Sequence, residues 1–277
     1  MTDYYEMIYK RKSFHLFRNV GDEKLTDNDL QGIRAAYEKI VALYPDIRTD
    51  IRIVSSDEKV LGRGAEYAIE IYSEKKDNYL MNAGYIGEML DLYLVSKNIG
   101  SLWFGIGKPE EKEYNDLSFV IMILIAKVDC AEKFRKDMFK SKRKPLEDIW
   151  EGELIPGVSD IVRFAPSACN SQPWYVKREG DMLEIYRHGK SGRVGIMPSN
   201  IVNVMNRIDM GIFIRFLELC LQHENYDFSR ELFVDEGLDD KRTVVAQYVL
   251  NDITAANADF VNRRANCEDR TYSYVCQ

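Results

Sequence analysis

An internal repeat restricts this chain to a fold made of two similar units. Residues 77–128 and 204–253 share the same succession of an apolar helix, a polar exit and an apolar strand. Asn82 and Asp209 lie at matching places near the helix starts and are 127 positions apart, and the exits and strands keep this offset. Alternation of helices and strands alone would give only a loose match. A constant offset over three elements predicts that each half of the chain folds in the same way.

Each unit is predicted to be α+β, with a small, mainly antiparallel sheet and one central buried helix. The helices at residues 78–97 and 204–223 are apolar on nearly all sides, as expected for helices packed in the centre of a protein. Predicted strands flank them in two matching pairs: residues 68–72 with 182–186, and residues 119–123 with 246–250. Two such degenerate halves in one chain imitate a twofold dimer. We therefore expect a pseudo-dimer whose internal interface forms clefts that suit ligands.

The predicted boundary between the halves lies near a basic segment, residues 140–145. We expect a first half at residues 1–140, a second half at residues 141–253 and a C-terminal tail at residues 254–277. Charged runs that end in proline are typical of solvated linkers. The same cationic side chains would also suit a phosphate group, so the segment is either a linker or part of an anion site.

Composition and charge exclude several classes of protein. The chain has 277 residues and a net charge of −7, which argues against the basic surface that nucleic-acid binding requires. Its longest apolar run, residues 119–126, is too short to span a membrane, and its first residues do not resemble a signal peptide. The five cysteines are scattered, which favours reduced thiols, and three histidines are too few for a His-rich metal site or a Ser-His-Asp triad. We therefore expect a cytoplasmic protein with no metal, nucleic-acid or membrane partner.

The segment at residues 165–174 is the strongest functional signal. Its two prolines exclude a helix interior, and we expect a loop that follows a short helix at residues 159–164 and leads into a strand. The side chains of Ser167, Asn170 and Gln172 can hydrogen-bond a planar polar ligand, and the small residues between them let that ligand come close. The alternative is an ordinary turn built on Asn and Ser chemistry.

Two further segments contain groups that suit a phosphate and a flat ring. The first places two cations and a hydroxyl in succession: Arg11, Lys12 and Ser13. Arginine binds phosphate oxygens in a forked geometry, although such triplets are also common on protein surfaces. The second segment is predicted to leave the first buried helix as a short strand and to turn after two aromatic residues and a glycine: Trp103, Phe104 and Gly105. These side chains would flank a ring system or belong to an ordinary core strand.

Taken in order, these segments resemble the nitroreductase family of FMN-dependent oxidoreductases. Residues 165–174 match the family motif A-P-S-x-x-N-x-Q-P-W almost residue for residue, and this match is highly specific. Weaker matches are residues 11–15 with R-x-S-x-R/K, residues 98–105 with the flavin loop, and residues 142–146 with K/R-x-P-L. The resemblance covers roughly residues 4–250. In ordinary members the A-P-S motif follows soon after the first motif, whereas here it occurs only in the second half, which resembles a single-chain, duplicated branch of the family.

The resemblance implies that FMN lies between the halves, with one site per chain. The phosphate would be bound by Arg11, Lys12 and Ser13 of half one together with Arg143 of the basic segment that follows it. Half two would contact the flavin ring through Pro166, Ser167, Ala168 and Asn170, with Gln172 as support. Backbone groups of the family loop around Phe104 and Gly105 would face flavin N5, and Trp103 would also bind the cofactor. His15 stands where the family has Arg or Lys, and it would either stabilise negative charge on the reduced flavin or point to solvent.

The function implied is that of an FMN-dependent NAD(P)H oxidoreductase. A hydride would pass from NADH or NADPH through flavin N5 to a nitroaromatic, a quinone or a similar small-molecule electron acceptor. No catalytic side chain is required, because the flavin carries the chemistry. The pseudo-dimer could act as a monomer. The alternative is a flavin-binding protein without turnover, a carrier or a sensor. Two features favour it: the pseudo-symmetric second site lacks both motifs, and His15 replaces the Arg or Lys of the family.

Overall fold

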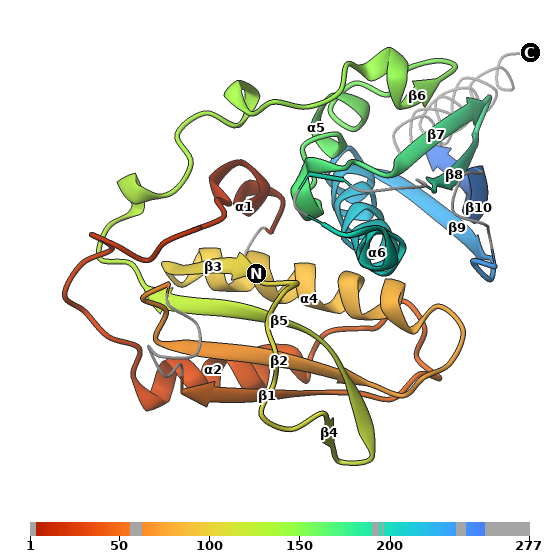
Figure 1. Cartoon of the computed structure of the whole chain (residues 1–277). Coiled ribbons are helices and arrows are strands. Elements are labelled where there is room, and N and C mark those ends of the chain that lie inside the picture. The colour runs from red at the N-terminus through yellow and green to blue at the C-terminus, as the bar shows by residue number, and fades with distance from the viewer. Residues whose placement is uncertain (1–3, 56–62, 190–193, 196, 237–241, 253–277) are drawn as a thin grey trace, which may run out of the picture.

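Two five-stranded sheets form the framework of the protein, one in each half of the chain (Figure 1). The computed structural model describes residues 4–55, 63–189, 194–195, 197–236 and 242–252. The first sheet contains β1 (Thr49–Ser55), β2 (Tyr67–Ser73), β3 (Ile99–Trp103), β4 (Glu113–Tyr114) and β5 (Leu117–Lys127). The second contains β6 (Trp150–Glu151), β7 (Trp174–Glu179), β8 (Met182–His188), β9 (Tyr226–Leu232) and β10 (Arg242–Asp252). All described pairs are antiparallel except β6 with β7.

The two sheets repeat one strand order. The first runs β1-β2-β5-β3 and the second runs β7-β8-β10-β9, with β4 and β6 added at different places. The turn from helix to strand is repeated too, because Asn98 and Asn225, 127 positions apart, both adopt a left-handed backbone, with φ of 54° and 60°. Asparagine tolerates this conformation better than most residues. The sequence repeat is therefore also a repeat in three dimensions, and the α+β prediction with two similar sheets is confirmed.

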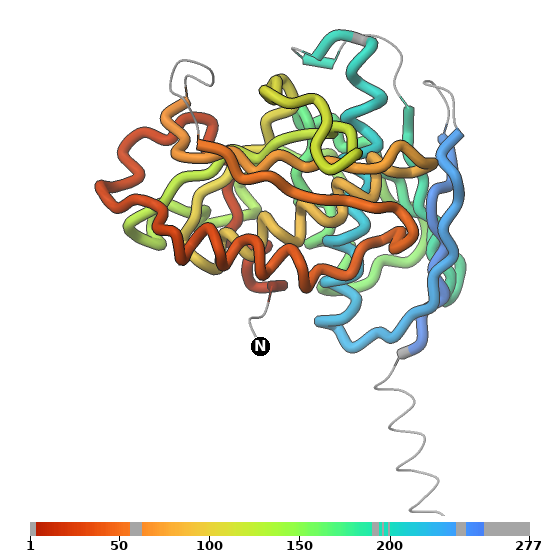
Figure 2. The backbone as a smooth tube through the Cα atoms, turned by 90° about the horizontal axis from the view of Figure 1, so that it is seen from below, coloured from red at the N-terminus to blue at the C-terminus, as the bar shows by residue number. Residues whose placement is uncertain are grey.

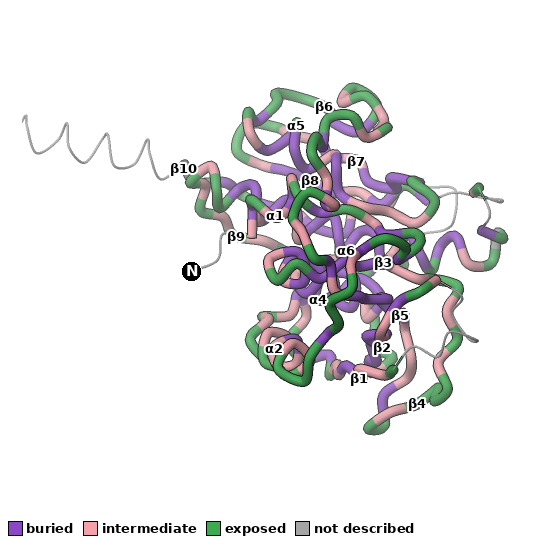
Figure 3. The backbone as a smooth tube through the Cα atoms, turned by 90° about the vertical axis from the view of Figure 1, so that its left-hand side faces the viewer, coloured by how far each residue is buried: buried purple, intermediate pink, exposed green. Residues whose placement is uncertain are grey.

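The central helices α4 (Tyr79–Ser96) and α6 (Ser199–His223) pack against each other, and each also lies on its own sheet (Figures 1 and 3). A Cβ atom added at Gly84 would lie 2.0 Å from the carbonyl oxygen of Ile208. A Cβ atom added at Gly211 would lie 1.9 Å from the carbonyl oxygen of Met81. Gly84 and Gly211 are 127 positions apart, as are Met81 and Ile208. The helix contact is therefore self-complementary, as in a twofold dimer.

The smaller helices complete the two halves. Helix α1 (Tyr4–Lys10) packs on both central helices, and α5 (Ser159–Val162) packs on α6. Helix α2 (Asp27–Tyr37) begins in a capping box made by Thr26 and Asp29. Short 3₁₀ turns lie at Ala131–Lys133, Met138–Lys140, Leu146–Asp148 and Ala168–Asn170.

Two helix boundaries differ from the sequence prediction. The apolar periodicity of residues 26–43 predicts a helix that reaches Leu43, but α2 ends at Tyr37, because the chain turns so that Leu43 enters the core while Val41 stays 74% exposed. Helix α6 begins at Ser199, five positions before the predicted start at residue 204, directly after Pro198 as N-cap. Apolar periodicity shows which residues are buried more clearly than where a helix begins.

The connection at residues 128–149 runs from the first sheet across to the second half, past α1 (Figure 1). Figure 2 shows β9 and β10 along the outer side of the second half. No helix among the described residues is long and apolar enough to cross a membrane. The predicted tail at residues 254–277, which includes Cys267 and Cys276, lies outside the described residues.

Candidate functional site

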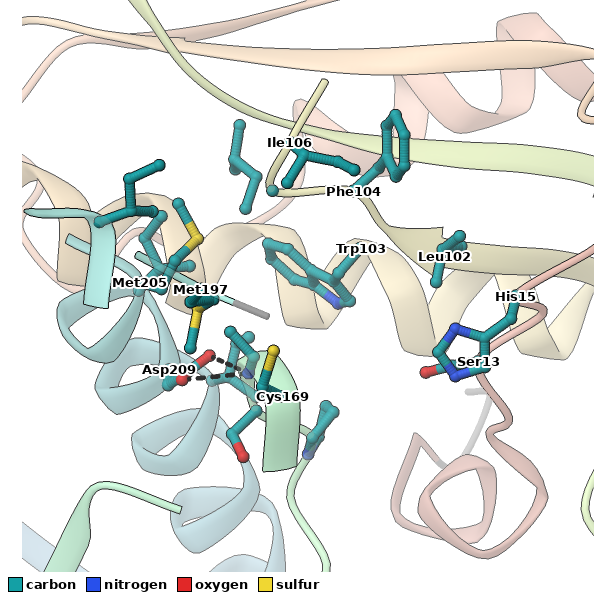
Figure 4. A pocket seen from close by; sticks show the side chains of 18 of the residues that line it. Ser13, His15, Leu102, Trp103, Phe104, Ile106, Cys169, Met197, Met205 and Asp209 are labelled. Carbon is teal, nitrogen blue, oxygen red and sulfur yellow. Dashed lines mark hydrogen bonds between the residues drawn. The ribbon is translucent and has the colours of Figure 1, made fainter. Parts of the chain in front are cut away.

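A cavity of about 270 Å³ lies between the two halves (Figure 4). Half one contributes the N-terminal segment after α1, Arg63, and the end of β3 with its following turn. Half two contributes the loop before β7 and the first turns of α6. Most of its lining is apolar, and the charged or titratable side chains that line it are Arg11, His15, Arg63, Cys169 and Asp209. A cavity with mostly apolar walls and a few polar groups is typical of cofactor sites.

Arg11 enters the cavity from the end of α1 and is 2% exposed. Its Nε donates to Asp91 Oδ2 at 2.7 Å and lies 3.2 Å from Glu88 Oε1. Burial raises the pKa of Glu88 well above its usual value, and the charge of Arg11 opposes this shift. Arg11 Nη2 is buried and has no hydrogen-bond partner among the described residues. The arginine is therefore fixed in place with its Nη2 amino group left for a ligand.

Ser13 and His15 follow along the edge of β3. Ser13 forms a parallel bridge with Ser101, and the next residue, Phe14, donates its backbone N–H to the Ser101 carbonyl at 2.9 Å. The side chain of Ser101 in turn donates to Asp91. The exposed His15 accepts at its carbonyl from Arg63 Nη1 at 2.8 Å, so a fixed cation lies beside it. Arg63 belongs to none of the motifs in the sequence.

Four arginines lie close enough for their charges to interact, and two carboxyl groups, Glu88 and Asp91, pair with one of them. Arg143 donates to Asn170 Oδ1 and to the Phe164 carbonyl, both at 3.1 Å, and its buried Nε has no partner among the described residues. Burial, together with the charges of Arg135, Arg11 and Arg163, lowers the pKa of Arg143 to about 10. Burial and the charge of Arg11 likewise lower the pKa of Arg135 to about 10. Cations that lower each other's pKa form a positive site that favours an anion.

The turn after β3 forms one wall of the cavity. Trp103 Nε1 donates to Asp91 Oδ2 at 3.1 Å, which holds the indole in place. The guanidinium of Arg63 lies 5.3 Å from the centroid of the Phe104 ring. At Gly105, an added Cβ would lie 2.9 Å from Met205 Sδ on α6, so this turn lies directly beside a side chain of the other half.

The loop before β7 forms the opposite wall, and its backbone is unusual. Cys169, Asn170 and Gln172 adopt left-handed conformations, with φ of 49°, 55° and 47°. Gln172 is 3% exposed and accepts from the backbone N–H of Lys144 at 2.8 Å, while its own N–H donates to Ser167 Oγ at 3.0 Å. Left-handed non-glycine residues cost free energy and persist only where other contacts hold them. This loop is held in a shape that its sequence alone does not favour.

Asp209 lies beneath that loop on α6 and is 3% exposed (Figure 4). Its two oxygens accept from the backbone N–H of Ala168 at 3.0 and 3.1 Å, and Oδ2 also accepts from Ser171 Oγ at 3.2 Å. Burial raises the pKa of Asp209 to about 7, and the two hydrogen-bonding groups oppose the shift.

Most of the residues predicted from the sequence line the cavity. They are Arg11, Ser13, His15, Trp103, Phe104, Gly105, Pro166, Ser167 and Ala168. Arg143, Asn170 and Gln172 lie behind the wall, where they bond to each other's segments. Lys12 points elsewhere, because its Nζ donates to the Lys133 carbonyl at 2.9 Å and lies 5.0 Å from the Phe14 ring centroid.

Several lining residues were missed. Arg63, Asp209 and an apolar wall made by Met197, Pro198, Ile201, Met205, Ile208 and Ile212 belong to no motif. Asp209 follows Asn206 and Arg207 in the sequence, and the one signal that could have indicated it is its helical spacing with the apolar residues Met205 and Ile212.

At the pseudo-equivalent place, 127 positions away, side chains form a closed network instead. Glu218, the counterpart of Asp91, accepts from the hydroxyls of Tyr85 and Tyr248 and from Arg230, the counterpart of Trp103. The guanidinium of Arg215 lies 3.5 Å from the centroid of the Tyr85 ring. At equivalent positions, half one therefore forms a wall of the cavity, whereas half two forms a packed ionic cluster.

Comparison with known proteins identifies the family. Residues 3–220 match the model of a family described as "Putative TM nitroreductase", which is more than half of the chain. The chain belongs to the nitroreductase family. No curated protein matches it.

The chain is similar to solved structures of nitroreductases. A nitroreductase of Thermotoga maritima is 19% identical, with a TM-score of 0.57, and the alignment covers 90% of this chain and 93% of that one. At this identity the likeness shows the nitroreductase-like fold. A nitroreductase from Desulfovibrio desulfuricans in complex with FMN is 17% identical, with a TM-score of 0.39, over 56% of this chain and 99% of its own. A nitroreductase family protein from Clostridium difficile is 16% identical, with a TM-score of 0.44, and the alignment covers 56% of this chain and 100% of that one.

Proposed function

We propose that this nitroreductase-family chain is an FMN-dependent oxidoreductase that uses NADH or NADPH to reduce a small acceptor such as a nitroaromatic or a quinone. One observation carries the proposal: a single cavity joins the basic N-terminal segment, the turn after β3 and the A-P-S loop, although these segments are far apart in the sequence. When bound, FMN would supply a ring that takes up a hydride at N5 and passes electrons on.

The positive site beside the cavity fits the phosphate of FMN. Arg11 Nη2 and Arg143 Nε are buried donors without partners among the described residues, and a phosphate would satisfy such donors. Arg135 would be a third cation at this site. Its pKa is lowered by burial and by the charge of Arg11. A bound dianion would raise the pKa values of Arg135 and Arg143 towards their ordinary range, because it neutralises the repulsion between the guanidinium groups.

The cavity walls fit a flat ring. The aromatic turn Trp103–Gly105 lies on one side and Pro166, Ser167 and Ala168 lie on the other, so a ring would be held between them. Arg63 would supply the cation that this chain lacks at His15, because its guanidinium is anchored on the His15 carbonyl. A fixed cation near the pyrimidine end of a flavin stabilises the charge that develops on reduction.

We further propose one FMN per chain, bound between a half at residues 1–140 and a half at residues 141–253. The ionic cluster of Tyr85, Arg215, Glu218 and Arg230 supports this count, because it fills the pseudo-equivalent place. Since both walls come from one chain, a monomer would be sufficient. The described cysteines Cys130, Cys169 and Cys220 are unpaired, which supports a cytoplasmic location.

The test is a titration of the purified protein with FMN, followed by anaerobic addition of NADH or NADPH. We expect a yellow protein with one FMN per chain that is bleached by a nicotinamide and regains its colour when a quinone or nitroaromatic is added. A protein that stays colourless contradicts the proposal. A protein that binds FMN but is not bleached by either nicotinamide supports the second candidate, a flavin carrier or sensor, which the exposed His15 at a position of expected fixed charge favours.

A further inference from the structure

In each half, a side chain of the central helix clamps a loop by accepting a backbone hydrogen bond, and the two side chains differ. In half one, Asn82 Oδ1 accepts from the backbone N–H of Tyr44 at 3.0 Å. In half two, Asp209, 127 positions later, accepts from the backbone N–H of Ala168 at 3.0 Å. The amide of Asn82 shows that a neutral acceptor is sufficient to hold such a loop. Half two has a carboxyl group instead, and it is the half whose loop lines the cavity.

The carboxyl group of Asp209 has no cationic partner in the described part of the chain. The titratable groups that share its cavity are Arg11, His15 and Arg63 from half one and Cys169 from the loop above it. Helix α4, packed against α6, carries Tyr85, Glu88 and Asp91; the Tyr85 hydroxyl donates to Glu218, and both carboxyl groups pair with Arg11. Burial, and not any of these charges, dominates the shift that raises the pKa of Asp209.

A second buried polar side chain, Asn206, lies on the same face of α6 and contacts the same loop. Asn206, one turn before Asp209, is fully buried, and its Oδ1 lies 3.3 Å from Ser171 Oγ. Its Nδ2 has no hydrogen-bond partner among the described residues. A protonated Asp209 keeps one oxygen for the Ala168 N–H and gains a donor for Ser171. The clamp is therefore maintained in both protonation states, and only the charge changes.

On the basis of the proposed function, we propose that Asp209 is a positioning residue that binds a proton when FMN enters the cavity. It holds the loop at residues 165–172 in either state, and it makes FMN affinity fall as pH rises through neutrality. The physical reason is desolvation: a ring that fills the cavity removes the remaining water near the carboxyl group, which penalises its ionised form. Each pKa unit that binding adds corresponds to about a tenfold difference in affinity between the protonated and the ionised protein.

The experiment compares FMN affinity in the wild type and in Asp209→Asn between pH 5.5 and 8.5. The variant restores the amide that Asn82 uses in half one, so the clamp remains. The phosphate of FMN titrates near pH 6 in both proteins, and this contribution cancels when the two are compared at each pH. We expect similar dissociation constants at pH 5.5 and a wild-type constant about tenfold above that of the variant at pH 8.5. Asn82→Asp is the matched control, and its ratio to the wild type should not change with pH.

A second measurement does not depend on the variant. In wild-type protein with ¹³C-labelled aspartate, one carboxyl resonance should titrate near neutral pH and move to higher pH when FMN is added. Identical pH profiles for wild type and Asp209→Asn, or a resonance that FMN does not move, overturn the inference alone. A loss of affinity in the variant that is equal at every pH also overturns it, because Asp209 is then only structural. If the wild type binds no FMN at all, the proposed function falls together with the inference.

Discussion

One methyl group added between the central helices is expected to push them apart and to destabilise the protein. In Gly84→Ala the new Cβ would lie 2.0 Å from the Ile208 carbonyl oxygen, and in Gly211→Ala it would lie 1.9 Å from the Met81 carbonyl oxygen. Ordinary contact begins at 3.4 Å, so the helices have to move apart by about 1.4 Å. The atom in the way is backbone, and no side-chain rotation can relieve the clash.

The expected cost is at the upper end of the range for overpacked cores, about 3 kcal/mol. A gap of 0.5 to 1 Å already forfeits roughly a quarter to a half of the dispersion energy of the atoms that face it. Helix propensity works in the other direction, because alanine is preferred over glycine by about 1 kcal/mol. For a chain of this size the net loss of about 2 kcal/mol lowers Tm by roughly 4–8 °C.

The assay is thermal unfolding followed by circular dichroism, with Gly32→Ala as the control. Gly32 lies in helix α2, where an added Cβ would meet only the terminal hydroxyl of Tyr93 at 2.8 Å, and that side chain can move. We expect Gly32→Ala to be neutral or slightly stabilising. We expect the double variant Gly84→Ala/Gly211→Ala to lose less than the sum of its parts, since the helices separate only once. An increase in Tm for Gly84→Ala, like that of the control, would refute the close helix contact.

Three further outcomes follow from charges and their partners. Arg143→Ala should raise the Kd for FMN about tenfold or more and leave the Kd for riboflavin nearly unchanged, because the lost bond is charge-assisted and goes to the phosphate; equal losses for both ligands would contradict this placement. In the protein without FMN, the folded state keeps a proton on Asp209 between about pH 4 and 7 that the unfolded chain has released, so this group's contribution to stability is present at pH 4 and lost as pH rises to 7. Urea unfolding should show about 4 kcal/mol less pH dependence over this range in Asp209→Asn, and parallel curves would exclude the shift. Glu218→Gln should cost about 3 kcal/mol, measured by urea unfolding, because Arg230 and two tyrosine hydroxyls lose their shared anion, while FMN affinity stays as in the wild type.

The elements of the fold were largely predictable because the signals are local. The apolar helix at residues 78–97 agrees with α4 to within one residue at each end, and the apolar run at residues 119–126 lies inside β5. The strand predicted to start after the A-P-S loop begins at Trp174. The end of α2 was not predictable, because it depends on where Leu43 meets the core, and that is a tertiary contact.

Residues of the candidate site were predictable from the sequence where they belong to a motif, and not elsewhere. Arg11, Ser13 and the loop at residues 165–174 came from short segments with a chemical pattern, and the structure brings them to one cavity. Asp209 and Arg135 act through partners that are distant in the sequence, namely the N–H of Ala168 and the other arginines. No local pattern encodes such partners, because they are set by how α6 and the connection between the halves pack.

The joining of both halves in one chain also affects how the protein can change over time. In a dimer of identical chains, one substitution alters both symmetric sites, so an improvement at one cannot be separated from its cost at the other. Here Asn82 and Asp209, or Asp91 and Glu218, are separate positions that mutate independently. The Gly84 and Gly211 contacts keep the shared frame, and around them one place has an open cavity and the other a packed ionic cluster. The chain can thus specialise one half for binding and use the other for stability, a division of labour that a symmetric dimer cannot reach by single substitutions.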